Sequence, residues 1–141
     1  MTQAVDPIAR FLESAAFGVV GASPRRHKYG NKVLRCYQQN GRTAIPVNPR
    51  ESIIEGAACV ASVLDLPAEV KSISIITPPS VTERVIEEAI RKGIGNVWMQ
   101  PGAESDAAVE ACRSAGINVI ADGSCVLVVL GYRDSWTAAA T

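Results

Sequence analysis

A glycine turn followed by cations is the stretch of the sequence best suited to binding chemistry. Gly21-Ala22-Ser23 precedes the cationic segment 25–28, and a helical pattern begins near Asn31. Glycine lets backbone amides approach a ligand closely, and a helix N-terminus carries a partial positive charge. This combination favours an anion, most simply a phosphate group. The predicted phosphate-binding residues are Gly21, Ala22, Ser23, Arg26 and Lys28.

A second polar stretch, Asn48-Pro49-Arg50, follows the next apolar run. Domains that bind NAD place a carboxylate at this position to bond the ribose hydroxyls, and they carry the motif G-x-G-x-x-G. The glycines here stand at 18, 21 and 30 instead, and the charged residue is Arg50. A cation at that position would accept a phosphate on the ribose. The sequence therefore argues against NAD and leaves NADP or coenzyme A (CoA), because both carry a ribose phosphate.

Three further turns complete the predicted ligand rim. Thr77-Pro78-Pro79 is either an extended wall for an adenine or only a rigid turn, and its prolines are expected to delay the following helix to a capping box at Ser80. Gln100 follows the fourth apolar run, and Cys125 follows the fifth through a short turn. The candidate ligand-binding residues on these turns are Thr77, Pro78, Pro79, Gln100 and Cys125.

Groups that could catalyse a reaction are few. His27 is the only histidine, and neighbouring cations would favour its neutral form. Asp122 is a single carboxylate, while Glu104 and Asp106 stand at a helix start, where capping and the helix dipole explain them. Catalysis requires a positioned acid, base, nucleophile or metal. We therefore predict no catalytic residues, no metal ligands and a binding module rather than an enzyme.

The elements that must position these residues alternate between short apolar runs and helical patterns. The runs predict strands at 17–20, 43–47, 72–76, 96–99 and 118–121, and the patterns predict helices at 7–16, 31–40, 61–66, 80–92 and 105–115. Periodicity leaves 126–130 open between a sixth strand and a helical turn. Such alternation is typical of an α/β fold with one doubly wound parallel sheet, Rossmann-like, in the strand order 3-2-1-4-5 with helices on both faces.

Length and composition limit the domain organisation and the partners. The 141 residues suit a single domain, 1–141, with a core of about 15–130 and a tail of 134–141 that Trp136 could tether. Balanced charges, 14 basic against 14 acidic residues, provide no broad positive field, so we expect no nucleic-acid partner. The apolar runs are too short to cross a membrane and no basic leader precedes an apolar stretch, so we expect a cytoplasmic protein without a membrane partner.

Five motifs together resemble a known family. They are Val19 to Ser23 with Lys28-Tyr29-Gly30, Ile45 to Pro49, Thr77 to Pro79, Val97 to Gly102, and Val119 to Cys125. The chain resembles the CoA-binding Rossmann-like domain of succinyl-CoA synthetase α subunits and, more closely in length, stand-alone CoA-binding proteins. The resemblance implies that the glycine loop takes phosphate, that 48–50 lines the ribose-phosphate side and that 77–79 lies beside the adenine.

The same resemblance limits the activity. The synthetases act through a phosphorylated histidine in a second domain, and His27 does not match that position. We therefore predict a non-catalytic module that binds coenzyme A or an acyl-CoA, its small-molecule nucleotide ligand. The alternative is an NADP-dependent oxidoreductase, disfavoured by the missing glycine motif and by the lack of a Tyr-x-x-x-Lys pair. The apolar run 126–130 is a candidate subunit contact for a homodimer.

Cysteine spacing adds a last expectation. Cys36, Cys59, Cys112 and Cys125 form no C-x-x-C pair and have no histidine at zinc-binding spacing, so free thiols are expected. Cys125 is either a core residue or a rim thiol near the pantetheine end of CoA, where it could form a mixed disulfide with that ligand.

Overall fold

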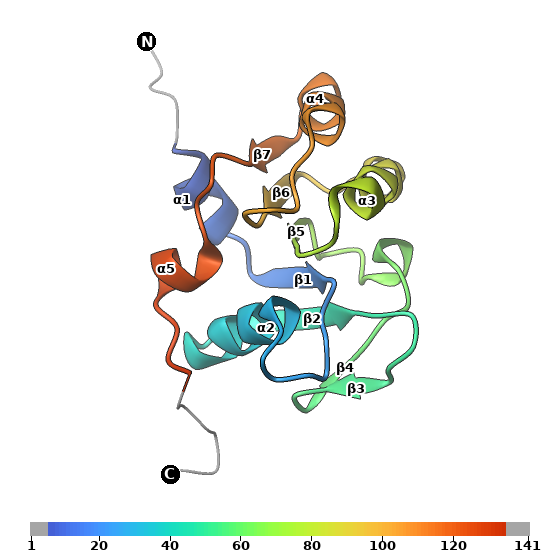
Figure 1. Cartoon of the computed structure of the whole chain (residues 1–141). Coiled ribbons are helices and arrows are strands. Elements are labelled where there is room, and N and C mark those ends of the chain that lie inside the picture. The colour runs from blue at the N-terminus through green and yellow to red at the C-terminus, as the bar shows by residue number, and fades with distance from the viewer. Residues whose placement is uncertain (1–5, 135–141) are drawn as a thin grey trace.

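A five-stranded parallel sheet forms the centre of the molecule (Figure 1). The computed structural model describes residues 6–134, so the prediction for Trp136 and the rest of the tail lies outside the described residues. In spatial order the strands are β2 (Thr43–Val47), β1 (Ala16–Val20), β5 (Ser72–Ile75), β6 (Asn96–Met99) and β7 (Asn118–Ile120). The α/β class and the parallel, Rossmann-like sheet are confirmed.

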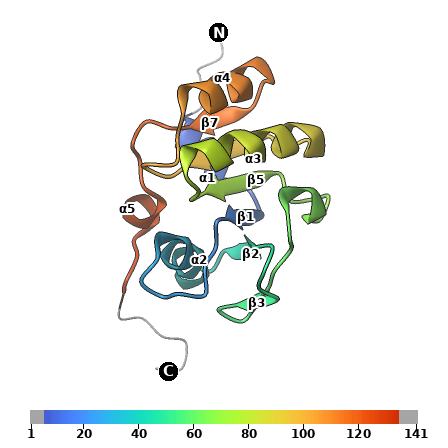
Figure 2. The same cartoon turned by 45° about the vertical axis from the view of Figure 1, so that its right-hand side comes forward.

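Helices cover both faces of this sheet. One face packs against α1 (Pro7–Leu12), α2 (Tyr29–Gln39) and α5 (Val126–Leu130), and the other packs against α3 (Pro79–Lys92) and α4 (Asp106–Ser114). Figure 2 shows α3 and α4 side by side, with α2 and α5 apart from them. Between β2 and β5 the chain forms a small antiparallel hairpin, β3 (Ile53–Ile54) and β4 (Ala57–Ala58), and the 3₁₀ turn η1 (Val63–Asp65).

The predicted strand order 3-2-1-4-5 is wrong in one respect. The third strand of the main sheet, β5, pairs with the free side of β1, so the order is 2-1-3-4-5 in the same numbering. Pro46 lies in the middle of β2 and has no N–H to donate, which suits an edge strand and not an interior one. All four residues of β5 are buried, as an interior strand requires. The winding therefore reverses between β1 and β5.

Several predicted helix limits also need correction. The first helix ends at Leu12 and not near Ala16, because Ala16 already pairs with Thr43 in the sheet. The predicted helix at 61–66 is only the 3₁₀ turn at 63–65. Residues 126–130, left open by periodicity, form the helix α5.

The capping box predicted at Ser80 is absent, because α3 begins one residue earlier. Pro79 is its first residue and Pro78 is its N-cap. Proline fits this position because the first N–H groups of a helix have no partner within it. Thr82 makes the local contacts instead, and its hydroxyl lies 2.7 Å from that of Thr77. The predicted end at Gly93 is confirmed, since this glycine has a φ of 85°.

Aromatic side chains pack the helices α1 and α2 against one face of the sheet. Phe17 stacks on Tyr37 with 4.7 Å between ring centroids, and Phe11 meets the edge of Trp98 at 5.3 Å. Tyr37 also shares a 2.5 Å hydrogen bond with Ser74 of β5, and burial raises the pKa of its hydroxyl. These contacts hold α2, and therefore the loop that precedes it, against the centre of the sheet.

Candidate functional site

The carboxyl ends of β1, β2 and β5 meet where the winding reverses, which is where doubly wound sheets bind ligands. Gly21 ends β1 with a φ of 93°. A β-carbon on Gly21 would lie 2.6 Å from the carbonyl oxygen of Ile76. Only glycine fits both the backbone conformation and the space, so this turn brings the main chain against the neighbouring strand.

Gly30 has a second close approach that the sequence analysis did not identify. A β-carbon on Gly30 would lie 1.9 Å from the carbonyl oxygen of Gly21. The first turn of α2 therefore packs directly on the backbone that ends β1. In the glycine motif of dinucleotide-binding domains, one glycine has this same helix-packing role at a shorter spacing. The long loop between Gly21 and Gly30 disguises the relation in the sequence.

A pocket of about 240 Å³ opens at this point of the sheet. Five of the predicted ligand-binding residues, from three different loops, line it: Gly21, Ala22, Asn48, Pro49 and Thr77. Val63 from the 3₁₀ turn and Val81 and Val85 from α3 add apolar surface. Such a lining, mostly apolar with a few polar and backbone groups, is typical of small-molecule sites.

Asn48 ties two of the rim loops together. Its side-chain amide donates to the carbonyl oxygen of Ala22 at 2.9 Å, and its side-chain oxygen accepts from the amides of Arg50 and Glu51 at 2.7 and 3.1 Å. The Arg50 side chain is exposed beside this turn. Asn48 therefore holds the loop after β2 against the loop after β1, and Arg50 remains accessible to a ligand.

The predicted cations lie beyond the glycine turn. Arg26 and Lys28 are exposed, and Lys28 is the N-cap of α2. Arg26 lies with His27, Lys32, Arg35 and Asp134 around a hollow of about 350 Å³, separate from the lining of the smaller pocket. The Arg26 Nε atom is 3.6 Å from Glu55. Ser23, between the two regions, accepts a 3.1 Å bond from the Arg25 amide.

The remaining predicted residues lie farther along the same rim or at its outer edge. Gln100 is buried after β6, where its amide nitrogen donates to Cys125 Sγ at 3.3 Å and its oxygen accepts from the Val126 amide at 2.8 Å. Cys125 is partly buried and caps α5. Pro78 and Pro79 are exposed at the start of α3, and neither they nor Gln100 and Cys125 line the 240 Å³ pocket.

All four cysteines are free thiols, in agreement with the sequence analysis. Burial raises the pKa of Cys36 and of Cys112 to about 11. Burial and, secondarily, the charge of Glu51 raise the pKa of Cys59. Because the thiolate is the reactive form, these three thiols are held back from exchange reactions at neutral pH.

A larger hollow, an acidic groove of about 650 Å³, lies elsewhere, beside the edge strand β7 between α1 and α4. It is lined by five carboxylates and one cation: Asp6, Glu104, Asp106, Glu110, Asp122 and Arg113. Hydrogen bonds from the side chain and then the backbone of Ser124 lower the pKa of Asp122. Among residues 6–134 no group of three His, Cys, Asp or Glu side chains is arranged to hold a metal ion. In this part of the chain no helix has both the length and the apolar character to cross a membrane.

The parallel sheet, its reversal point and the glycine turn define a Rossmann-like α/β domain. Residues 15–131 match the model of the CoA binding domain family, so the chain belongs to that family. The ADP-forming acetate–CoA ligase I of Archaeoglobus fulgidus is 30% identical over 104 residues, which is 74% of this chain and 15% of the ligase. The α subunit of the ADP-forming acetate–CoA ligase II of Pyrococcus furiosus is 30% identical over 88 residues, or 62% of this chain and 19% of the subunit. The chain thus spans less than a fifth of these relatives.

Solved structures include both isolated domains and larger enzymes of similar fold. A conserved hypothetical protein from Pyrococcus furiosus has a TM-score of 0.77 and 38% identity over 81% of this chain and 97% of its own. A hypothetical protein from Pyrococcus horikoshii has a TM-score of 0.80 and 28% identity, covering 86% and 85%. The dinucleotide-forming acetyl-CoA synthetase 1 of Ca. Korarchaeum cryptofilum has a TM-score of 0.70 and 26% identity, covering 77% of this chain but 26% of the enzyme.

Proposed function

We propose that this chain binds coenzyme A or an acyl-CoA at the carboxyl ends of β1, β2 and β5, without catalysing a reaction on it. The observation that carries the proposal is the 240 Å³ pocket, where Gly21, Asn48 and Thr77 converge from three strands. Family membership supplies the ligand class. The apolar lining from Val63, Val81 and Val85 suits an adenine ring.

The charged parts of the ligand would lie outside this lining. The backbone after Gly21 would receive phosphate oxygens, because amide N–H groups in such turns bind anions. Arg50 is exposed and follows Pro49, which lines the pocket, and it would pair with the ribose phosphate. Arg26 and Lys28 would supply further positive charge on the loop. The thiol end of the ligand would then extend along the rim toward Gln100 and Cys125.

The pocket favours binding over chemistry. Among the described residues that line it, Glu88 is the only titratable one. A general acid and base pair, or a nucleophile beside a base, would need at least two such groups. The named relatives are ligases, but their activity belongs to chains of which this one spans less than a fifth. Carriage or sensing of the bound ligand is therefore the role that we propose, while a cytoplasmic location and a homodimer stay predictions.

Native mass spectrometry of the protein purified from cells tests the ligand directly. We expect a retained mass equal to CoA or an acyl-CoA, released on denaturation. Titration calorimetry of the ligand-free protein should then show about tenfold or greater preference for CoA over NAD, since no carboxylate stands at the end of β2 to bond ribose hydroxyls. A retained mass of NADP, or equal affinity for CoA and NAD, would contradict the assignment and favour the oxidoreductase alternative.

A further inference from the structure

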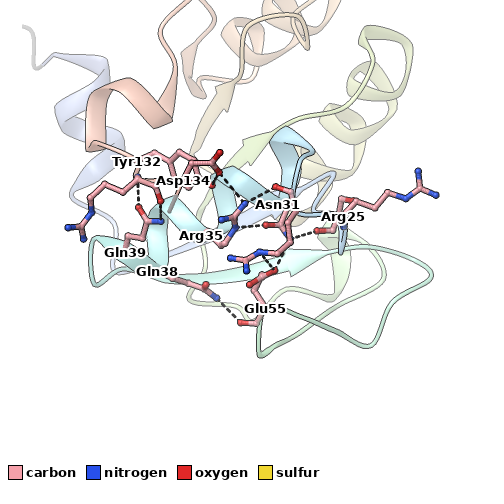
Figure 3. Close-up of polar contacts among 11 residues, drawn as sticks. Arg25, Asn31, Arg35, Gln38, Gln39, Glu55, Tyr132 and Asp134 are labelled. Carbon is pink, nitrogen blue, oxygen red and sulfur yellow. Dashed lines mark hydrogen bonds and ion pairs between the residues drawn. The ribbon is translucent and has the colours of Figure 1, made fainter. Parts of the chain in front are cut away.

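A buried arginine on α2 holds the loop that ends β1. Arg35 is 2% exposed. Its Nε donates to the side-chain oxygen of Asn31 at 2.6 Å, and one terminal nitrogen donates to the carbonyl oxygen of Arg26 at 2.7 Å (Figure 3). A charge this deeply buried is costly unless it is well paired. The guanidinium lies 3.8 Å from the exposed carboxylate of Asp134. Its two hydrogen bonds go to the loop backbone and to a neighbour on its own helix.

Asn31 extends the contact to the start of the same loop. This residue is fully buried, and its side-chain nitrogen donates to the carbonyl oxygen of Ser23 at 2.8 Å and to the carboxylate of Glu55 at 3.0 Å. With its oxygen accepting from Arg35, the amide uses both ends. Arg35 and Asn31 together hold the loop at two carbonyls, those of Arg26 and Ser23, which are three residues apart.

These contacts set the direction of the loop peptides. Side chains hold three loop carbonyls: Asn48 holds that of Ala22, Asn31 that of Ser23 and Arg35 that of Arg26. In a planar trans peptide the following N–H points opposite to the carbonyl. The N–H groups of Ser23 and His27 therefore point away from the side chains that hold their peptides. Carbonyl oxygens repel phosphates, and fixing them toward the protein leaves amides to face an anion.

Glu55, which contacts Asn31 and Arg26, is held in an unfavourable backbone conformation. Glu55 and Gly56 join β3 to β4, and Glu55 has a φ of 50°, a conformation in which Asn or Gly is favoured at such a two-residue turn. Its carboxylate accepts from Asn31 and pairs with Arg26, and its carbonyl oxygen accepts from Gln38 of α2 at 3.1 Å. A residue held in an unfavourable conformation with both ends engaged indicates a role beyond the turn.

We propose that Arg35 and Asn31 are positioning residues for the anionic part of the ligand. Arg35 holds the carbonyl of Arg26 inward so that the His27 amide can receive phosphate. Asn31 holds the carbonyl of Ser23 inward and thereby fixes the path of the loop, since the next residue, Pro24, has no N–H. The inference rests on the proposed function, because it assigns the loop the phosphates of CoA. It adds two buried residues of helix α2 that hold the loop.

Arg35→Lys is the decisive variant, because it keeps the positive charge but cannot hold Asn31 and the Arg26 carbonyl with a rigid fork of donors. Asn31→Ala removes the hydrogen bond that holds the carbonyl of Ser23. Gln39→Ala is the matched control: it lies on the same helix and also loses two hydrogen bonds, those to the backbone of Arg133 at 2.8 and 2.9 Å. We expect Arg35→Lys and Asn31→Ala to weaken CoA binding by about tenfold or more in calorimetry, and Gln39→Ala to leave it unchanged.

Amide hydrogen exchange of residues 22–28 in the ligand-free protein gives a readout that does not depend on CoA. Exchange should accelerate in Arg35→Lys and Asn31→Ala but not in Gln39→Ala, with thermal melting confirming that each variant is folded. Unchanged loop exchange, or unchanged CoA affinity in both loop variants, would overturn the inference. A wild-type protein that does not bind CoA would instead defeat the proposed function, and loop exchange would still decide whether these residues position the loop.

Discussion

The acidic groove beside β7 is larger than the pocket at the reversal point, but the pocket is better suited to a phosphorylated ligand. The groove beside β7 measures about 650 Å³ and the pocket at the reversal point about 240 Å³. Five carboxylates surround the groove, whereas the pocket ends at a glycine turn followed by cations. A ligand with several phosphates would be repelled by the first and attracted by the second. Charge and backbone access, and not volume, identify the candidate site.

Several acidic side chains around the groove also stabilise helix ends and turns. Asp6 caps α1 by accepting from the Ala9 amide, and Asp106 stands in the first turn of α4, where a negative charge stabilises the helix. Glu104 accepts from the Gly102 amide. By contrast, Asn48, which lines the pocket, and Asn31, behind the neighbouring loop, use their hydrogen bonds to hold loops in place, as a preorganised site requires. Three substitutions and one labelling experiment can break or sharpen this contrast.

Gly30→Ala should have the largest effect. Its new methyl group would lie 1.9 Å from the Gly21 carbonyl oxygen, so α2 or the glycine turn must move. We expect CoA binding to be lost and the free energy of unfolding to fall by about 2 kcal/mol or more, measured by calorimetry and urea denaturation. Gly95→Ala is the control, because a β-carbon there meets nothing within 4 Å. Retained affinity in Gly30→Ala would show that the turn takes no part in binding.

Arg50→Glu should have an intermediate and selective effect. Reversal of this exposed charge replaces attraction of the ribose phosphate by repulsion, so CoA affinity should fall by about tenfold. Dephospho-CoA lacks that phosphate, and its affinity should change by about twofold or less. Equal losses for the two ligands would mean that Arg50 does not read the ribose phosphate.

Cys125 follows β7 and accepts a hydrogen bond from Gln100 after β6, so its reactivity reports how far the ligand extends along the rim. In exchange with CoA disulfide, a Cys125 thiolate would attack one sulfur, form a protein–CoA disulfide and release CoA thiolate. We expect this adduct to form several times faster than at the other three cysteines, as measured by peptide mapping after brief exposure at pH 8. At that pH only about one thiol in a thousand is ionised at Cys36 and Cys112, whose pKa values are about 11.

The pH dependence provides the control for Cys125. Raising the pH toward 10 ionises a growing share of Cys36 and Cys112, so labelling at those sites should rise and the selectivity for Cys125 should fall. Labelling confined to Cys36, Cys59 or Cys112 at pH 8, or no CoA adduct at all, would mean that Cys125 has only a structural role.

Glu110→Gln should have the smallest effect on CoA affinity, and it tests whether the ligand contacts the groove. It removes one negative charge from the groove and leaves the pocket untouched, so CoA affinity should stay within about twofold of wild type. A marked gain in affinity would show that the ligand contacts the groove, and the contrast between the two regions would fail.

The sequence predicted the strands better than their order. The runs at 43–47 and 96–99 match β2 and β6 because turn residues bound each of them sharply. The order was missed because strand pairing depends on long-range packing, although Pro46 carried a signal that β2 is an edge strand. The capping box at Ser80 failed for a similar reason, since Pro79 is itself suited to the first helical position.

The loops of the candidate site were also predictable one by one, whereas the residues behind them were not. Asn31 and Arg35 are polar and four residues apart on a helix, a spacing that usually indicates a solvated face. Their burial arises only because the loop folds back over α2 and the hairpin brings Glu55 beside them. Gly30 was visible in the sequence, but its partner, the carbonyl of Gly21, becomes apparent only once the helix is packed.

Pro46 has a consequence for behaviour at high concentration. Unpaired sheet edges are templates on which other chains add strands and aggregate. At the outer side of β2 the proline offers no N–H, its carbonyl already accepts from Val60 at 3.0 Å, and the carbonyl of Val60 accepts from the Asn48 amide at 2.9 Å. Between Pro46 and Asn48 these groups are therefore not free to pair with a second molecule, so this part of the edge is protected against edge-to-edge polymerisation while the ligand rim stays open.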